Sequence, residues 1–183
     1  CSAYVNVCTA ILDELHAAYG AAFPQAQFTI WNRTASKAQT MAAALPNTTA
    51  TDDLESAVKA ADIVTCATMS TDPILCGDWL RPGQHIDLIG AYRPDMREAD
   101  DIALTRASIF VDSLDTTVGH IGELKIPIEA GVISAQDIVA DYYAPTQFKR
   151  TSDAEITLFK NGGGAHLDLM TCRYILDRWH QTT

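Results

Sequence analysis

The sequence predicts an α/β fold: a Rossmann-like, doubly wound parallel sheet followed by a C-terminal return segment and a final helix. Two observations support this class. Short β-favouring runs alternate with segments whose apolar residues recur every 3.6 positions. The runs at 63–67 and 85–89 are mostly apolar, as expected for parallel strands buried on both faces. The short connections between them indicate βαβ units with right-handed crossovers.

Residues that open and end helices mark the elements of the first half. Pro24 and Pro46 each end a helical pattern, because proline cannot continue a helix. Asp52 and Glu55 form a variant of the capping box, which opens a helix. In order, we expect a strand at 4–7, a helix at 10–23, a strand at 28–31, a helix at 37–45, a helix at 52–61 and the strand at 63–67.

The second half continues the alternation less regularly. After the strand at 85–89, residues 109–111 form the next β-favouring run, and 115–124 is loosely helical. A glycine-rich turn at 162–164 opens a last helix whose apolar residues share one face. The other elements expected here are a helix at 135–142 and a strand at 156–160.

Composition limits the partners that we expect. The chain has 183 residues, 48 % of them hydrophobic, enough for a core without a structural metal. Its net charge of −10 argues against nucleic acid or an anionic membrane, and no apolar run approaches the ~20 residues of a membrane span. Five cysteines without a Cys-x-x-Cys predict reduced thiols in a cytoplasmic protein. No histidine stands at metal-ligand spacing, so no metal site is expected.

The corner after the second strand, Asn32-Arg33-Thr34, is the most informative polar segment. In a dinucleotide-binding sheet this corner meets the adenosine ribose, where an acid would bind the 2′-hydroxyl of NAD and repel the 2′-phosphate of NADP. Here it carries a guanidinium, an amide and a hydroxyl, which suit a phosphate. The sequence therefore favours NADP(H), with NAD(H) as the second choice; a polar helix cap that binds nothing is the alternative.

The loop after the first strand lacks the glycines of a dinucleotide fingerprint. The backbone must approach the pyrophosphate closely, yet Val7, Thr9 and Ala10 stand there without a glycine among them. Thr9 could still cap the helix and donate to a phosphate, and Ala10 is small. A turn that binds no phosphate remains an equal alternative.

A third loop follows the strand at 63–67. It consists of Ala67, Thr68, Met69 and Ser70. Its hydroxyl groups could bind a ribose or a nicotinamide, because ligands of open α/β sheets lie at the carboxyl ends of strands. An ordinary turn before Pro73 is the alternative.

A fourth loop begins at Ile89 and Gly90 and carries many charges. Arg93 or Arg97 could hold a substrate carboxylate. A solvated run of charges without a chemical role is the alternative. The acids that could move a proton are Asp95, Glu98 and Asp100.

Several phrases in their order carry a family resemblance. They are 28–34 (FTIWNRT), 61–68 (ADIVTCAT), 85–100 (HIDLIGAYRPDMREAD), 110–113 (FVDS), 126–131 (IPIEAG), and 152–160 (SDAEITLFK) with 161–168. Together they resemble the ornithine cyclodeaminase/mu-crystallin family. The resemblance implies a bilobed homodimer that binds NAD(H) or NADP(H) in a Rossmann domain, and an enzyme that transfers hydride at the α-carbon of an imino or amino acid.

The resemblance also assigns domains and residues. It implies a Rossmann domain at 1–145, with 146–183 belonging to the second lobe, which binds substrate and forms the dimer. It places Asn32-Arg33-Thr34 at the adenosine ribose, and Thr68 and Ser70 near the cofactor. Lys160, Asn161 and Gly162 match a turn beside the nicotinamide, where asparagine replaces the usual serine. Asp168 matches an aspartate of the final helix.

Three departures from the family pattern qualify this expectation. The phosphate loop lacks glycine, and Tyr92 stands where the cyclodeaminase and alanine dehydrogenase branches have a catalytic aspartate. By the resemblance, we also expect the N-terminal lobe that grips the substrate carboxylate to be missing from these residues. Tyr92 favours a ketimine or pyrroline-carboxylate reductase over deamination of ornithine or alanine. We expect this chain alone to show little turnover. A binding or scaffold protein with a degenerate dinucleotide site is the main alternative.

Overall fold

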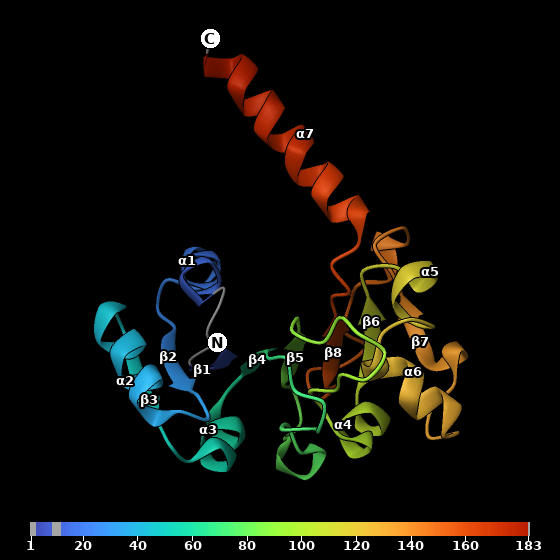
Figure 1. Ribbon diagram of the computed structural model, residues 1–183, viewed down its shortest axis with the longest axis horizontal. Coiled ribbons are helices and arrows are strands. Elements are labelled where there is room, and N and C mark those ends of the chain that lie inside the picture. Colours follow the sequence, from blue (N-terminus) through green and yellow to red (C-terminus); the bar gives the residue numbers. More distant parts are fainter. Residues whose placement is uncertain (1–2, 9–11, 183) are drawn as a thin grey trace.

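The computed structural model describes residues 3–8 and 12–182, and it forms one parallel sheet with helices on both faces (Figure 1). The strand order is β3-β2-β1-β4-β5-β8-β6-β7, and every described pairing is parallel. The strands are β1 (Ala3–Cys8), β2 (Gln27–Trp31), β3 (Thr48–Thr51), β4 (Ile63–Ala67), β5 (His85–Leu88), β6 (Ser108–Val111), β7 (Ile138–Ala140) and β8 (Thr157–Lys160). The expected Rossmann-like α/β class is therefore confirmed.

Helices cover the two faces of the sheet unequally. The helices are α1 (Leu12–Ala22), α2 (Ala35–Ala44), α3 (Leu54–Ala60), α4 (Asp101–Arg106), α5 (Leu114–Thr117), α6 (Gly122–Glu129) and α7 (Ala165–Thr182). On one face, Tyr19 of α1 packs near Phe28, and Ala38 of α2 packs against Ile30. The other face holds the main core, in which Val58 of α3 and Leu124 of α6 belong to the same cluster as strand residues. A sheet covered on both faces is doubly wound.

The alternating sidedness of the strands explains this division. Ile86 and Leu88 of β5 are buried in the main core, whereas His85 and Asp87 of the same strand face the other side. Successive side chains of a strand point to opposite faces, so each strand contributes to both layers. The apolar residues of β4 and β8 follow the same alternation, with Val64, Cys66 and Leu158 in the main core.

Several elements differ from those expected from the sequence. The strand β3 was not expected, because its residues Thr48–Thr51 carry no apolar run. The helix expected at 135–142 is a 3-10 turn followed by β7. The cap of α3 is Asp53, whose side chain accepts from the Ser56 amide at 3.0 Å, and not Asp52. Of these differences, the missed β3 is explained by its polar sequence and its place at the sheet edge, since such strands lack the apolar pattern that reveals buried strands.

The C-terminal segment joins the sheet and then leaves it. The expected boundary at residue 145 placed β8 with a second lobe, whereas β8 lies between β5 and β6 in the main sheet. Helix α7 follows and projects away from the rest of the fold, with the C-terminus at its far end (Figure 1). Its large apolar side chains are exposed: Leu169, Met170, Tyr174, Ile175, Leu176 and Trp179.

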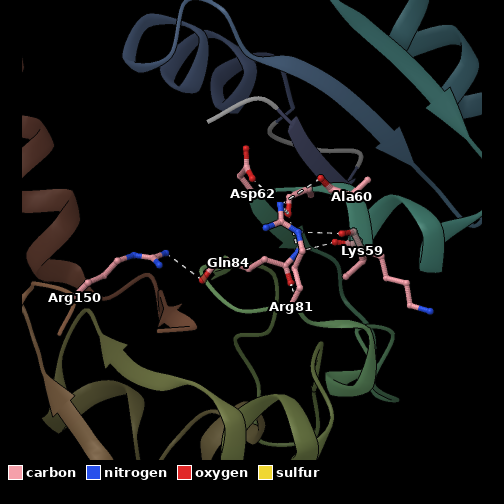
Figure 2. Close-up of polar contacts among 8 residues, drawn as sticks. Lys59, Ala60, Asp62, Arg81, Gln84 and Arg150 are labelled. Atoms are coloured by element: carbon pink, nitrogen blue, oxygen red, sulfur yellow. Dashed lines mark hydrogen bonds and ion pairs between the residues drawn. The ribbon is translucent and has the colours of Figure 1, made fainter. Parts of the chain in front are cut away.

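The amino ends of strands β4, β5 and β8 are stabilised by side chains that cap the end of α3 (Figure 2). The buried Gln84 amide donates to the carbonyls of Val58 and Ala61, both at 2.7 Å. Arg81 donates to the Ala61 carbonyl at 2.8 Å and to the Asp62 carboxylate at 2.6 Å. These bonds satisfy carbonyls that the end of a helix leaves without partners.

We predict that Gln84→Ala lowers the free energy of unfolding by about 2 kcal/mol, because two carbonyls at the end of α3 each lose one of their donors. Chemical denaturation monitored by circular dichroism measures the loss. Gln39→Ala, at an exposed position of α2, serves as the control and should change stability by less than about 0.5 kcal/mol. Equal stability of the two variants would contradict this role of Gln84.

Candidate functional site

The carboxyl edge of the sheet contains a topological switch point. From β1 the chain first adds β2 and β3 on one side and then crosses to β4 and β5 on the other. Such a reversal leaves a crevice between the diverging connections, and ligands of open α/β sheets bind there. The loops after β2, β4, β5 and β8 all reach this edge because their strands are parallel. Thr9 and Ala10 lie outside the described residues, and Val7 is part of β1.

The corner after β2 is polar and open. Asn32 Oδ1 accepts from the amide of Thr34 at 2.9 Å, which turns the chain into α2. Thr34 occupies the cap position of α2, but its side chain makes no capping bond. Arg33 is exposed, and so is the neighbouring Lys37. The corner therefore offers a cation to solvent beside a helix N-terminus, with no acid among the residues 32–37.

The loops after β4 and β5 touch each other at Gly90. A Cβ atom on Gly90 would lie 2.0 Å from the carbonyl oxygen and 2.1 Å from the amide nitrogen of Thr68. Only glycine allows the two backbones to approach so closely. In the first of these loops Met69 is 71 % exposed, and the Ser70 hydroxyl donates to the Asp72 carbonyl at 2.6 Å. Ile89 extends the sheet by donating to the Cys66 carbonyl at 2.7 Å.

Glu98 joins these two loops from below. Its Oε1 accepts from the amide of Thr68 at 2.6 Å and from the Thr68 hydroxyl at 3.0 Å. Its Oε2 accepts from the amides of Gly90 at 2.8 Å and Ala91 at 3.2 Å. The residue is 0 % exposed, and each of its carboxylate oxygens accepts two hydrogen bonds from the protein. The sequence indicated Glu98 only as a group that could move a proton.

Lys160 supplies the charge that faces Glu98. It ends β8, is 0 % exposed, and donates from Nζ to the Leu88 carbonyl at 3.2 Å. Burial lowers its pKa, while the surrounding carboxylates, Glu98 first among them, oppose that shift. The resemblance placed Lys160 beside a nicotinamide. In the structure its side chain is buried beneath the carboxyl edge, on the same face of the sheet as Leu88.

Glu123 of α6 supports Glu98 in turn, a role that the sequence analysis did not predict. Its carboxylate accepts from the amides of Glu98 at 2.7 Å and Ala99 at 3.0 Å. Burial raises its pKa to about 7, and the two backbone bonds only partly oppose this. Gly122 beside it approaches the backbone of Pro94 and Met96, where a Cβ would lie 2.6 Å from a carbonyl oxygen.

The turn after β8 lies next to the Gly90 loop. The Asn161 amide donates to the Leu88 carbonyl at 3.0 Å, and Asn161 Oδ1 accepts from the Gly163 amide at 2.9 Å. A Cβ on Gly162 would lie 2.3 Å from the Thr117 hydroxyl, so this position needs glycine. Beyond it, His166 Nε2 lies 3.8 Å from Oδ2 of the buried Asp112, and among the described residues neither atom has a hydrogen-bond partner.

The basic candidates for substrate binding are already paired. Arg93 forms two hydrogen bonds with Asp95, at 3.0 and 2.9 Å, and both side chains are exposed. Arg97 is buried and pairs with Asp101 at 2.8 Å. Asp100 caps α4 by accepting from the Ala103 amide at 2.8 Å. The structure therefore brings the Thr68, Gly90 and Asn161 segments into contact and gives these charged residues local partners.

A separate cavity of about 300 Å³ lies away from this edge. It is lined by His85 and Thr157, which begin β5 and β8, by Lys149 and Arg150, and by an aromatic group. The aromatic group comprises Phe110, Tyr142, Phe148 and Phe159. Burial lowers the pKa of His85 to about 4, so its imidazole is neutral and bonds to the Thr157 hydroxyl at 2.8 Å. No metal-binding group of three His, Cys, Asp or Glu side chains occurs among the described residues.

Comparison with known proteins agrees with this geometry. The sequence profile of the ornithine cyclodeaminase/mu-crystallin family matches residues 14–183. The chain belongs to this family. It is 49 % identical over 166 residues to a Δ1-pyrroline-2-carboxylate reductase of Paracoccus denitrificans. The aligned residues cover 86 % of this chain and 52 % of that protein. The chain thus spans about half the length of the curated relatives that it matches.

Two solved structures share the fold of this family member. An archaeal alanine dehydrogenase dimer with bound NAD matches with a TM-score of 0.88 and 24 % identity, covering 99 % of this chain and 58 % of that chain. The Thermococcus litoralis Δ1-pyrroline-2-carboxylate reductase in complex with NADH and L-proline matches with a TM-score of 0.81 and 23 % identity, covering 88 % and 53 %. Within the described residues no helix is long and apolar enough to span a membrane.

We predict that Glu123 makes stability depend on pH. Its pKa in the folded protein is about 7, above its ordinary value of 4.5. Between these pH values the unfolded chain loses the Glu123 proton while the folded protein keeps it, so the free energy of the unfolded state falls relative to that of the folded state. The contribution of Glu123 to the free energy of unfolding should therefore fall by roughly 1–3 kcal/mol as pH rises from 4.5 to 7.

Denaturation of the parent and of Glu123→Gln at several pH values measures this dependence. The difference in stability between the two should shrink or reverse with rising pH, because glutamine does not titrate. Glu129→Gln, an exposed acid of the same helix, is the control and should run parallel to the parent. A pH profile of Glu123→Gln parallel to that of the parent would refute the assignment.

Proposed function

We propose that this chain is the dinucleotide-binding part of an NAD(P)H-dependent reductase that acts on a cyclic imino acid of the pyrroline-carboxylate type. The 49 % identity to a Δ1-pyrroline-2-carboxylate reductase carries the proposal most directly. The carboxyl edge supports it, because the Thr68 hydroxyl follows β4, which borders the switch point where dinucleotides bind in such sheets, and the Gly90 loop touches it from the next strand. Tyr92, in place of an aspartate, favours reduction over deamination.

The chain's own residues would bind and orient rather than react. A nicotinamide dinucleotide, when bound, supplies the hydride for the imine carbon. The loops at 67–70 and 89–90 would hold its ribose and nicotinamide end, and the turn at 161–162 would flank them. The buried side chains of Glu98 and Lys160 would exclude water beneath these loops and keep them in place. Correct orientation and exclusion of water are the main protein contributions to hydride transfer.

We further propose a preference for NADP(H) over NAD(H). The support is the exposed Arg33 beside Asn32, at the end of β2, without an acid that would repel a phosphate. A guanidinium forms planar, charge-assisted hydrogen bonds with phosphate oxygens. The Thermococcus reductase carries NADH and the archaeal alanine dehydrogenase carries NAD, so the support for NADP(H) comes from this chain's own corner.

We predict that Arg33→Ala weakens NADPH binding roughly ten- to a hundredfold and leaves NADH binding nearly unchanged. The loss reflects one charge-assisted contact with the 2′-phosphate. Titration followed by nicotinamide fluorescence measures both affinities. Lys37→Ala, which removes an exposed cation four residues away, should have the smaller effect. Equal affinity of the unmutated chain for the two cofactors would contradict the preference.

We propose that the functional assembly is a homodimer whose second lobe covers α7. The support is the group of large apolar side chains exposed along α7, including Leu169, Ile175 and Trp179, since surfaces of this kind mark interaction sites. The archaeal relative of the same fold is described as a dimer. The other proposed partner is the small imino acid; we propose neither nucleic acid nor a membrane.

The activity itself is tested by NADPH oxidation with Δ1-pyrroline-2-carboxylate. We expect the chain to bind NADPH but to turn over at least about a hundredfold more slowly than a fusion that carries the N-terminal lobe of the Paracoccus reductase, because the substrate must be anchored before hydride transfer. Ornithine, tested for ammonia release, is the control substrate. Comparable turnover by both proteins would place the substrate anchor within this chain, and no binding of NADPH would refute the proposed function.

A further inference from the structure

We propose that Glu98 is the positioning residue of the cofactor site: its side chain fixes the two loops that receive the nicotinamide ribose and sets the Thr68 hydroxyl as an acceptor toward that ligand. This inference rests on the proposed function and deepens it. Glu98 would not touch the cofactor, because it is fully buried beneath the loops.

The first argument is that the Glu98 side chain bridges the two loops with four hydrogen bonds. One oxygen binds the Thr68 loop through two donors, and the other binds the Gly90 loop through two amides. The backbone of Glu98 adds to this link, since its carbonyl accepts from the amides of Ile74 and Leu75, both at 2.9 Å. One carboxylate thus binds both loops at once, and the bare Gly90 allows their backbones to touch.

The second argument concerns the direction of the Thr68 hydroxyl. A hydroxyl has one proton to donate and two lone pairs. Its proton is directed to Glu98, and one lone pair faces the Ser70 amide at 3.4 Å. The remaining lone pair can only accept. Thr68 therefore suits a ligand that donates, such as a ribose hydroxyl or the carboxamide nitrogen of a nicotinamide.

The third argument is that the site needs an ionised carboxylate. All four positions around the carboxylate are occupied by donors, so a proton on either oxygen would face an N–H or O–H group. Lys160 and the backbone amides oppose the upward shift in pKa that burial causes for Glu98. Glutamine keeps the shape of the side chain but turns an NH2 group toward two donors at one end, which unlocks one loop.

The test compares Glu98→Gln with Asp100→Asn in the whole chain. Asp100 is a matched control, because it is a carboxylate two residues away that accepts from the amides of Ala103 and Gly77 and lies outside the cofactor loops. Fluorescence titration gives the Kd for NADH and NADPH, and hydrogen exchange reports on the amides of Thr68, Gly90 and Ala91. Circular dichroism confirms that each variant is folded.

We expect Glu98→Gln to raise both Kd values at least about tenfold and to speed exchange at those three amides, whereas Asp100→Asn leaves the Kd within about twofold even where its melting temperature falls as far. A second pair of variants isolates the Thr68 hydroxyl. Thr68→Val should raise both Kd values, whereas Thr68→Ser, which keeps the hydroxyl, should leave them close to those of the parent. Parent-like Kd values for Glu98→Gln or Thr68→Val would overturn the positioning role while the proposed function stands. An unmutated chain that binds neither cofactor would refute the proposed function, and the positioning role with it.

Discussion

One buried carboxylate, that of Glu98, determines how the carboxyl edge of this sheet is built. Parallel strands end at the same edge, but nothing in a parallel sheet sets how far apart their loops stand. Glu98 links the loops after β4 and β5 by accepting from four of their donors, and the Arg97 amide adds a bond to the Ser70 carbonyl at 3.0 Å. The buried Lys160 and the backbone amides oppose the rise in pKa that burial causes for Glu98, which favours its charged form.

The two ends of the sheet are stabilised by different chemistry. At the amino ends of β4, β5 and β8, Gln84 and Arg81 satisfy the carbonyls that α3 leaves open, which is a purely structural task. At the carboxyl ends, charged side chains are buried as a linked group: Glu123 holds the backbone of Glu98, and Glu98 holds the loops. Buried polar networks of this kind fix one geometry when every member has its partners. The end with the buried charges is also the one where the fold places a ligand.

The sequence allowed the class of fold to be predicted, but not every element or the role of every charge. The buried strands β4 and β5 could be predicted because their apolar runs differ from the helical period around them. The strand β3 could not, because Thr48–Thr51 is polar and lies at the sheet edge. The position of β8 between β5 and β6 is a long-range pairing that local pattern does not encode. Likewise Lys160 and Glu98 look like surface charges until the sheet brings carboxylates and loops around them.

The backbone amide spectrum of the chain during titration with NADPH tests the central claim most directly, because it shows where a dinucleotide binds. The structure predicts that the resonances of Thr68, Gly90, Ala91 and Arg33 shift together and saturate with one Kd. Shifts confined to the aromatic cavity around Phe110 and Phe148, with those four resonances unmoved, would contradict the account.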